Sequence, residues 1–363
     1  MTLMHKHLQY HHGINLGGWL AQYDFTEGAP LDGRPQLERH FDTFITEEDI
    51  ERIHSWGFDH VRIPLDGRTL SDEDAVWDEA ALQAVHRALR WCGSRQMGVI
   101  LDLHDFPGNE YGQMSHPIPM LTDPNLTARF VHAWRSLAIL LRDWPGRAIM
   151  FELFNEISDS TGYLWNDLCA QAARPIREID DDRLILIGSN HQNSVNYLTQ
   201  LNLMDDPNIV YNFHYYDPQV FTHQKAHFSE EMRDFNRTIT YPGDISAFAD
   251  YLAAHPQWRS KHELTAHETR NDRALMERLL ADAHKFVQYS GHDLYCGEYG
   301  VIDTAPAAEA VKWLEDFWRI SDATGFGRAL WNYKTLDFGL VNLHGEIVHP
   351  EIVDALVHYG NPA

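Results

Sequence analysis

The sequence predicts an α/β protein, a (β/α)8 TIM barrel with a small subdomain inserted between strand 6 and helix 6. The first supporting observation is a β-then-α alternation that recurs eight times along the 363 residues. The second is the composition of the strand candidates, which are short runs of Ile, Val, Leu and Phe without clean alternation, as in parallel strands covered on both faces. No repeat, low-complexity tract or linker interrupts the chain, so we expect one catalytic domain over residues 1–363.

The expected elements follow one another in the order that such a barrel requires. The strand candidates are residues 13–18, 60–65, 99–104, 149–155, 184–189, 209–215, 294–298 and 328–332. Helical periods occupy residues 80–95, 126–142, 163–179, 271–289 and 307–324. A further helix is expected after Thr46, an N-cap residue followed by three acidic residues, and it should end at Gly57.

One connection is much longer than a βα unit needs. It runs from the end of the sixth strand, near Tyr216, to the seventh strand, near Leu294. We therefore predict that residues 217–268 form a partly helical inserted subdomain over the face of the barrel where the strands end.

Composition narrows the classes of partner. The formal net charge of −24 argues against nucleic acid and anionic membranes and is compatible with a neutral substrate. No apolar run approaches the roughly 20 residues of a membrane span, and the N-terminus lacks the apolar core of a secretory signal. We therefore expect a cytoplasmic monomer. The three cysteines are scattered, which predicts neither a disulfide framework nor a metal site.

Two glutamates follow apolar strand candidates at the points where the chain should turn. Glu156 closes the run that begins at Ile149, and Glu298 closes the run that begins at Leu294. A carboxylate is costly to place beside a buried strand without a partner or a task. Two carboxylates that face one cleft are the minimum equipment for cleaving a glycosidic bond.

Polar or aromatic residues close nearly every strand candidate. They are Asn15, Arg62, His104, Asn155, Glu156, His214, Tyr216, Glu298 and Trp331. Packing would explain one such residue, such as a buried histidine or a structural ion pair. Packing does not explain a ring of them at the end of the barrel where active sites form.

The chemistry suggests a role for each member of this ring. Glu298 would be the nucleophile, kept ionised by Arg62 and by the Tyr216 hydroxyl. Glu156 would be the acid/base, with a pKa raised toward the working pH and His214 as a hydrogen-bond partner.

Two further members of the ring would bind the sugar. Asn155 could hold the 2-OH of the sugar, a contact that strengthens in the transition state. Trp331 would form the floor of the subsite just before the cleaved bond, although a plain core residue is the alternative interpretation.

Motifs around these residues resemble those of glycoside hydrolase family 5, the large cellulase family of (β/α)8 barrels. The motifs are GINLGGW (13–19), HVRIP (60–64), LDLH (101–104), FNE (154–156), YNFHYY (211–216), GEYG (297–300) and LWNYK (330–334). The resemblance implies Glu156 as acid/base and Glu298 as nucleophile, and it implies neither a cofactor nor a metal. The supporting and substrate-binding residues that it implies are Asn15, Arg62, His104, Asn155, His214, Tyr216, Trp331 and Lys334.

Finer stretches resemble the group of clostridial endoglucanase C and its relatives within this family. They are HFDTFITEEDI (40–50), FTHQKAH (221–227), YPG (241–243) and YCGEYGV (295–301). Two positions depart from that group, with Asp105 in place of a second His and Phe228 in place of a Trp. Both departures leave the chemistry intact and bear on the choice of substrate.

The expected function is that of a retaining endo-β-1,4-glucanase acting on carboxymethyl cellulose, lichenan or mixed-linkage glucan. A β-mannanase, or an exo-acting β-glucosidase or transglycosylase on the same scaffold, is the nearest alternative. The 23 histidines raise a metal-dependent hydrolase as another. However, His5, His7, His11 and His12 lie before the first strand candidate ends and are expected to form a solvated tail. A non-catalytic sugar-binding protein is disfavoured because both glutamates are present.

Overall fold

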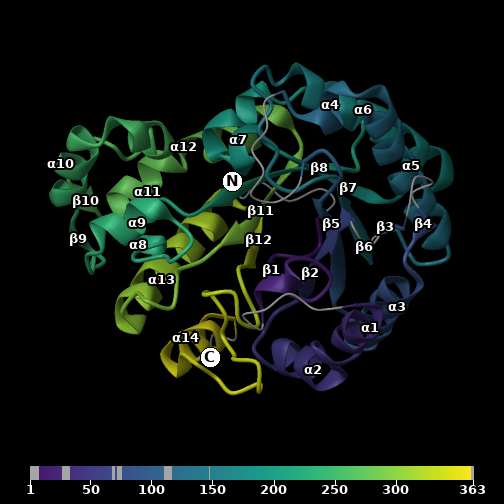
Figure 1. Ribbon diagram of the computed structural model, residues 1–363, viewed down its shortest axis with the longest axis horizontal. Helices are drawn as coiled ribbons and strands as arrows, with labels where there is room; N and C mark the ends of the chain where they lie inside the picture. The colour runs from purple at the N-terminus through teal and green to yellow at the C-terminus, as the bar shows by residue number, and fades with distance from the viewer. Residues whose placement is uncertain are drawn as a thin grey trace.

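Eight parallel strands close into a barrel in the order β1-β12-β11-β8-β7-β6-β5-β2, as Figure 1 shows. The structure is a computed structural model that describes residues 8–26, 33–67, 70–71, 76–109, 117–146 and 148–360. The barrel strands are β1 (His12–Asn15), β2 (His60–Asp66), β5 (Gly98–Asp105), β6 (Ile149–Glu152), β7 (Leu184–Gly188), β8 (Ile209–Tyr215), β11 (Asp293–Tyr299) and β12 (Gly327–Leu330). All eight predicted strands are present, and the predicted barrel is confirmed.

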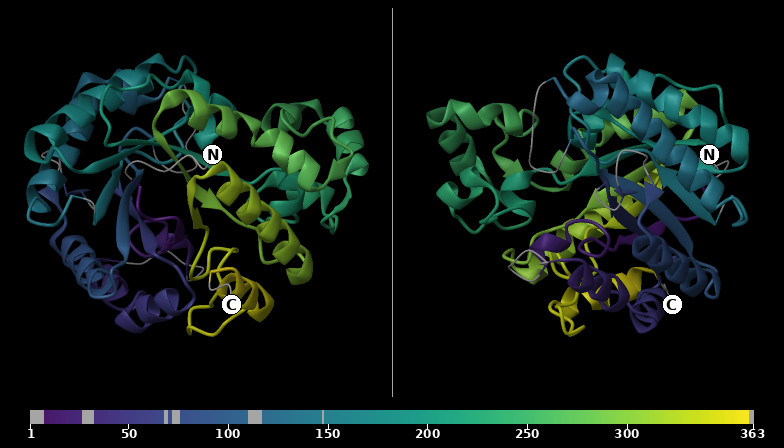
Figure 2. Two further views of the ribbon diagram at one scale, coloured as in Figure 1. Left: turned by 180° about the vertical axis from the view of Figure 1, so that it is seen from behind. Right: turned by 45° about the vertical axis from the view of Figure 1, so that its right-hand side comes forward.

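Helices surround the barrel and cover its outer face (Figures 1 and 2). They include α1 (Arg34–Thr43), α2 (Glu47–Ser55), α3 (Glu79–Gly93), α5 (Pro124–Leu140), α6 (Tyr163–Ile179), α12 (Ala281–Ser290), α13 (Ala307–Thr324) and α14 (Pro350–Gly360). Shorter elements are η1 (Tyr23–Phe25), α4 (Pro119–Thr122), α7 (Asn190–Asn193), η3 (Val195–Gln200) and a small hairpin of β3 (Leu70–Ser71) and β4 (Val76–Trp77). Within the described residues, none of these helices combines the length and the apolar character needed to cross a membrane.

The helix predictions hold with two qualifications. Thr46 caps α2 in a capping box, in which its hydroxyl accepts from the Asp49 N–H and the Asp49 carboxylate accepts from the Thr46 N–H. The single helix predicted over 271–289 is two helices, α11 (Arg273–Leu279) and α12, because Leu280 adopts φ −85° and ψ 2°. Helix α1 escaped prediction because it buries only two of its residues and therefore has little apolar periodicity.

The long connection between β8 and β11 contains several elements of its own. They are α8 (Gln219–Thr222), α9 (Glu230–Phe235), β9 (Gly243–Asp244), α10 (Ser246–Ala254), η4 (Pro256–His262) and β10 (Arg270–Asn271), followed by α11 and α12. Strands β9 and β10 pair with each other antiparallel. In Figures 1 and 2 the green elements α8 to α11 lie together at one side of the barrel. That residues 217–268 act as a separate subdomain over the active face stays a prediction.

The interior of the barrel is layered along the strands. The layer near the strand N-termini is apolar and consists of Leu8, Ile100, Met150, Leu184, Leu186, Val210, Tyr295 and Ala329. Residues two positions further along several of these strands are polar, because side chains on one face of a strand recur every second residue. This polar layer comprises Arg62, Asp102, Glu152 and Asn212, all fully buried. The active site begins directly above it.

Tryptophans on the surrounding helices fix the main chain beside the site. The Trp134 indole on α5 donates to the Leu153 carbonyl at 3.1 Å, just after β6. The Trp165 indole on α6 donates to the Gly188 carbonyl at 2.9 Å, at the end of β7. A buried Trp satisfies its N–H in this way while its rings fill the core, so both contacts anchor the segments that follow these strands.

Strands β1 and β2 pack closely near their N-termini, and this packing leads to a prediction about stability. A Cβ on Gly13 would overlap the ring of His60, which is held by Tyr295 Oη at 2.6 Å from Nε2 and by Asp59 at 2.5 Å from Nδ1. We expect Gly13→Ala to destabilise the fold by about 1–3 kcal/mol through overpacking, measured as a lower denaturant midpoint. The matched control is Gly93→Ala in α3, where a Cβ meets no atom within 4 Å. Its midpoint should stay or rise, since Ala favours helix by about 1 kcal/mol over Gly; equal midpoints for both variants would contradict the packing argument.

Candidate active site

A buried arginine is the centre of the site. Arg62 on β2 is fully buried, and its Nε and Nη2 donate to the two carboxylate oxygens of Glu152 at 2.7 and 2.8 Å. Such a bidentate pair fixes the plane of the guanidinium as well as its position. Glu152 also accepts from the Asn212 amide at 2.7 Å, so its own orientation is fixed from β8.

The remaining N–H groups of Arg62 reach four other residues. Its Nη1 donates to Glu298 Oε1 and Asn15 Oδ1, both at 2.9 Å, and its Nη2 lies 3.0 Å from Asn155 Oδ1 and from Asp102 Oδ2. Burial opposes the charge of Arg62, but the adjacent carboxylates outweigh that effect and hold its pKa well above the usual value. Arg62 is therefore a permanent cation beneath the site.

His104 is held between Asp102 and Trp331. Its Nδ1 lies 2.7 Å from Asp102 Oδ2, and its ring stacks on Trp331 with centroids 5.6 Å apart and planes 7° apart. Burial lowers the pKa of His104 to about 4, so the ring is neutral at neutral pH. Burial raises the pKa of Asp102 to about 7 although Arg62 acts in the opposite direction. The contact with Asp102 holds the His104 ring in place against the face of Trp331.

Glu156 lies just beyond β6 in an unusual backbone conformation. Its φ is +43°, a left-handed value that costs about 1–3 kcal/mol for a residue other than glycine. The preceding Asn155 is anchored by its N–H to the Leu103 carbonyl at 3.0 Å. Strained conformations persist only where their surroundings enforce them, so the contacts of this turn hold Glu156 in its unusual conformation.

Glu156 has one hydrogen-bond partner among the residues around it that the structure describes. Its Oε1 lies 2.9 Å from His214 Nδ1, and 25% of its side chain is exposed, so a substrate can reach the carboxyl group. Burial raises the pKa of Glu156 to about 7, although His104 and Arg62 act against that rise. A carboxyl group of this kind can both give and take a proton near neutral pH.

A β-bulge directs Glu298 into the site. In β11, Cys296 pairs with Phe213 of β8, but Glu298 pairs with the next residue, His214, so Gly297 is the extra residue. Without the bulge, strict alternation would place Tyr295 and Glu298 on opposite faces. The Gly297 N–H donates to Asn212 Oδ1 at 2.8 Å, and its carbonyl accepts from Asn15 Nδ2 at 3.0 Å. The polar layer thus satisfies the backbone groups that the bulge leaves unpaired.

Glu298 receives donors from two directions. Arg62 donates to its Oε1 at 2.9 Å, and the Tyr216 hydroxyl donates to its Oε2 at 3.0 Å. The residue is only 5% exposed. Both oxygens of the Glu298 carboxyl group are therefore fixed in place by a donor.

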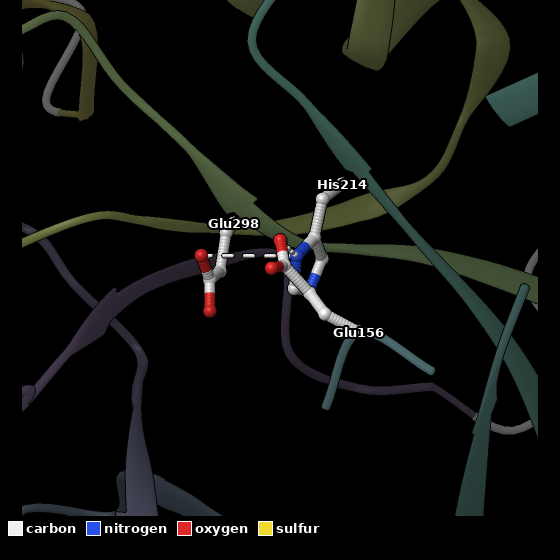
Figure 3. Close-up of side chains that lie close together, drawn as sticks. All are labelled: Glu156, His214 and Glu298. Atoms are coloured by element: carbon white, nitrogen blue, oxygen red, sulfur yellow. Dashed lines mark hydrogen bonds and ion pairs between the residues drawn. The ribbon is translucent and has the colours of Figure 1, made fainter. Parts of the chain in front are cut away.

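The two glutamates and His214 meet at the ends of their strands. One oxygen of Glu156, one oxygen of Glu298 and His214 Nδ1 all lie within 4.8 Å of one another, and Figure 3 shows the three side chains converging. Retaining glycosidases hold their carboxyl groups about 5–5.5 Å apart, and inverting enzymes hold them about 6.5–9.5 Å apart. The approach of one oxygen of each glutamate to within 4.8 Å is nearer to the retaining spacing than to the inverting one. These three are also a set of described residues whose atoms could hold a metal ion.

Most residues predicted for the site are brought together by this network. They are Asn15, Arg62, His104, Asn155, Glu156, His214, Tyr216, Glu298 and Trp331. Lys334 has no hydrogen bond to this network within the part of the chain that the structure describes, and its role at the site stays a prediction. Its Nζ is buried and donates to the Phe44 carbonyl at 2.6 Å and to Asp49 at 3.2 Å, so it holds α2 against the segment after β12.

The expectation of a solvated histidine tail is wrong at His12. His12 is the first residue of β1, and its Nδ1 accepts from Arg328 Nη2 at 2.9 Å. It therefore belongs to the barrel, at the strand end opposite to Asn15. His5 and His7 lie outside the described residues.

Sequence reasoning found Arg62 but missed the other three residues of the supporting polar layer, Asp102, Glu152 and Asn212. Asp102 and Asn212 stand two residues before His104 and His214 on the same strands, so period-two alternation would have placed them on the same interior face. Glu152 stands inside the apolar run before Glu156 and carried the same signal as a lone charge in a buried strand. Asn193, which contacts His214, had no signal in its sequence.

The two departures from the clostridial group lie at different depths. Asp105 ends β5, pairs with Asp66 of β2 and is 8% exposed. Phe228 is 53% exposed, with the edge of its ring against His223. His223 in turn meets Tyr216 edge-on with centroids 5.0 Å apart, which places Phe228 on the path leading outward from Glu298.

Comparisons with known proteins agree with this geometry. The family "Cellulase (glycosyl hydrolase family 5)" matches residues 27–337. Endoglucanase C of Acetivibrio thermocellus is 39% identical over 346 residues, which cover 95% of this chain and 97% of that protein. Cellodextrinase A of Ruminococcus flavefaciens is 29% identical over 317 residues, covering 87% and 83% of the two chains.

A solved structure supports the fold independently. Thermotoga maritima Cel5A in complex with cellobiose superposes with a TM-score of 0.72 at 21% identity, covering 96% of this chain and 97% of that one. This likeness shows the barrel fold. The family match over most of the chain and the 39% identity to endoglucanase C establish that the protein belongs to the cellulases of glycosyl hydrolase family 5 and is an endoglucanase-like glycoside hydrolase.

Proposed function

We propose that the protein is a retaining endo-β-1,4-glucanase that cleaves soluble or amorphous β-glucan by double displacement. The carrying observation is the approach of the Glu156 and Glu298 carboxyl groups to within 4.8 Å. The 39% identity to an endoglucanase over almost the whole of both chains supports the proposal.

In the first step, the Glu298 carboxylate attacks the anomeric carbon and forms a glycosyl–enzyme ester while Glu156 protonates the departing oxygen. Arg62 and Tyr216 hold the attacking carboxylate in place through its two oxygens. In the second step, Glu156, now ionised, takes a proton from water as the water attacks the same carbon. Glu298 leaves as a carboxylate, and the sugar keeps its anomeric configuration.

Three neighbouring residues are placed to stabilise the charge on Glu156 and to bind the sugar. His214 lies 2.9 Å from Glu156 Oε1 and is positioned to stabilise the ionised carboxylate that forms in the first step. Asn155, fixed by Arg62 at 3.0 Å, is placed to bind a sugar hydroxyl. Trp331, flat against His104, offers the apolar surface on which the CH face of a sugar can stack.

A substrate panel tests the proposal. We expect reducing sugar to be released from carboxymethyl cellulose, lichenan and mixed-linkage glucan, with oligosaccharides of mixed length as early products and no change on addition of a chelator. Release from mannan but not glucan would favour the β-mannanase, and single glucose units would favour exo action. Loss of activity with chelator would instead assign the cluster of Glu156, His214 and Glu298 to a metal ion.

Substitution of each glutamate separates the two roles. Glu298→Ala should lower kcat/KM by about 10,000-fold or more on all substrates, because the covalent route is lost. Glu156→Gln should lose most activity on oligosaccharides but retain more on an activated aryl glycoside, whose leaving group needs little protonation. Glu178→Ala, on the exposed face of α6, is the matched control and should be unchanged. Equal losses on both substrate types for Glu156→Gln would refute the acid role.

The pH profile follows from the state of Glu156. Because its pKa is raised to about 7 and the first step needs its protonated form, kcat/KM should fall as pH rises through about 7. A rate profile for Glu156→Gln on an aryl glycoside checks the assignment, since the basic limb should vanish; its persistence would show that another group sets it.

A further inference from the structure

A buried amide, that of Asn193, contacts the Nε2 atom of His214, whereas Glu156 contacts Nδ1. Asn193 is fully buried, and its Nδ2 lies 3.1 Å from His214 Nε2. On the other edge of the same ring, Nδ1 lies 2.9 Å from Glu156 Oε1 and 3.7 Å from Glu298 Oε2. The His214 imidazole therefore lies between the Asn193 amide and the carboxyl groups of the two glutamates.

The segment that carries Asn193 is held in a costly shape. Its three residues His191, Gln192 and Asn193 have φ of 50°, 57° and 54°, consecutive left-handed values that are sterically unfavourable for residues other than glycine. Hydrogen bonds enforce this shape, from the Gln192 N–H to the Ile157 carbonyl at 3.0 Å and from the Ser194 N–H to the Asn190 carbonyl at 3.1 Å. A shape this costly implies that the position of the amide matters.

The end of β7 is also fitted to the amide. Gly188 has no side chain, and the place of its Cβ is taken by the Asn193 side chain, with Cγ and Nδ2 each 2.9 Å away. Any larger residue at Gly188 would push the amide away from His214. The left-handed backbone of residues 191–193 and the absence of a side chain at Gly188 in β7 thus both allow the contact between Asn193 and His214.

We propose that Asn193 is a positioning residue that fixes His214 as the tautomer with its proton on Nδ1. This inference rests on the proposed roles of Glu156 and Glu298. Neutral imidazole carries one donor and one acceptor nitrogen, so an amide N–H that donates to Nε2 leaves the proton on Nδ1. Nδ1–H then points at Glu156.

This tautomer suits the cycle of charge on Glu156. Burial lowers the pKa of His214 to about 4, so the ring is neutral and only one nitrogen carries a proton. When Glu156 gives up its proton, Nδ1–H donates to the new carboxylate in a charge-assisted hydrogen bond, which is stronger than a neutral one. The opposite tautomer would direct a lone pair at the same carboxylate and destabilise it.

Other charged groups face this pair and stay unchanged in the test. They are Arg62 from β2, His104 from β5, Glu152 from β6 and Glu298 from β11. Asn193 touches neither carboxyl group in the hydrogen bonds of the described residues, so its effect must pass through His214.

The test is Asn193→Gly, which removes the amide while a glycine accepts the left-handed backbone at no steric cost. Without the fixed donor, Nδ1–H is no longer enforced and the ionised form of Glu156 loses stabilisation. We expect kcat on an aryl glycoside to fall about 10-fold, in the range seen for residues that orient a functional histidine. The basic limb of kcat/KM should move to higher pH. The matched control is Gln192→Gly, an exposed neighbour with the same backbone, which should keep the wild-type profile.

The tautomer of His214 can also be measured directly in the wild-type protein, so the test does not depend on the folding of the variant. Nitrogen NMR of the wild-type protein with labelled histidine, assigned with His214→Gln, should show the proton of His214 on Nδ1. A proton on Nε2, or an unshifted basic limb in a folded Asn193→Gly, would overturn the proposal. Absence of any glucan cleavage would refute the proposed function instead, because the tautomer is read without substrate.

Discussion

The site depends on one buried cation. Arg62 is surrounded by carboxylates or amides from β1, β5, β6, β11 and the turn after β6, and each of its contacts is 3.0 Å or shorter. Three carboxylates, Asp102, Glu152 and Glu298, share its single charge, so the buried cluster holds more negative than positive groups. Burial relieves this excess by raising the pKa of Asp102 and Glu152. Removal of the arginine would leave all three carboxylates in the barrel interior without a cation, which is far more costly than the pairs are stabilising.

The difference between the two glutamates arises from how the main chain presents them to this cation. The bulge at Gly297 turns Glu298 inward, where both of its oxygens receive donors. The left-handed turn at Glu156 lifts its carboxyl group toward the opening, where the only hydrogen bond described is with His214. Two carboxyl groups of the same chemistry are thus given different environments, which is how one site can hold a nucleophile and an acid. The backbone irregularities, and not the residue types, make this distinction.

Sequence periodicity predicted the parts of this arrangement that follow from regular structure. Parallel strands buried on both faces leave apolar runs, and their ends stand out as polar breaks, so the strands and most of the site residues were accessible from the sequence. Contacts between segments distant in sequence were not accessible. Lys334 has the same motif context as Trp331, yet its side chain turns away to Asp49 because its direction depends on how the chain returns beneath α2. Asn193 was hidden for a similar reason, since a run of left-handed residues without glycine has no compositional mark.

The layering of the barrel explains why the network can be ready before a substrate arrives. The apolar layer below, which includes Ile100, Met150 and Val210, closes the interior near the strand N-termini. The polar groups above it must therefore find partners within the protein, and each such partner fixes an orientation. Arg62, held by Glu152 through two hydrogen bonds, then holds Glu298 in place. In water, solvent dipoles must reorient around a charge as it develops, whereas here the polar groups are already oriented when the protein has folded. Preorganisation of this kind is usually the largest contribution to catalysis.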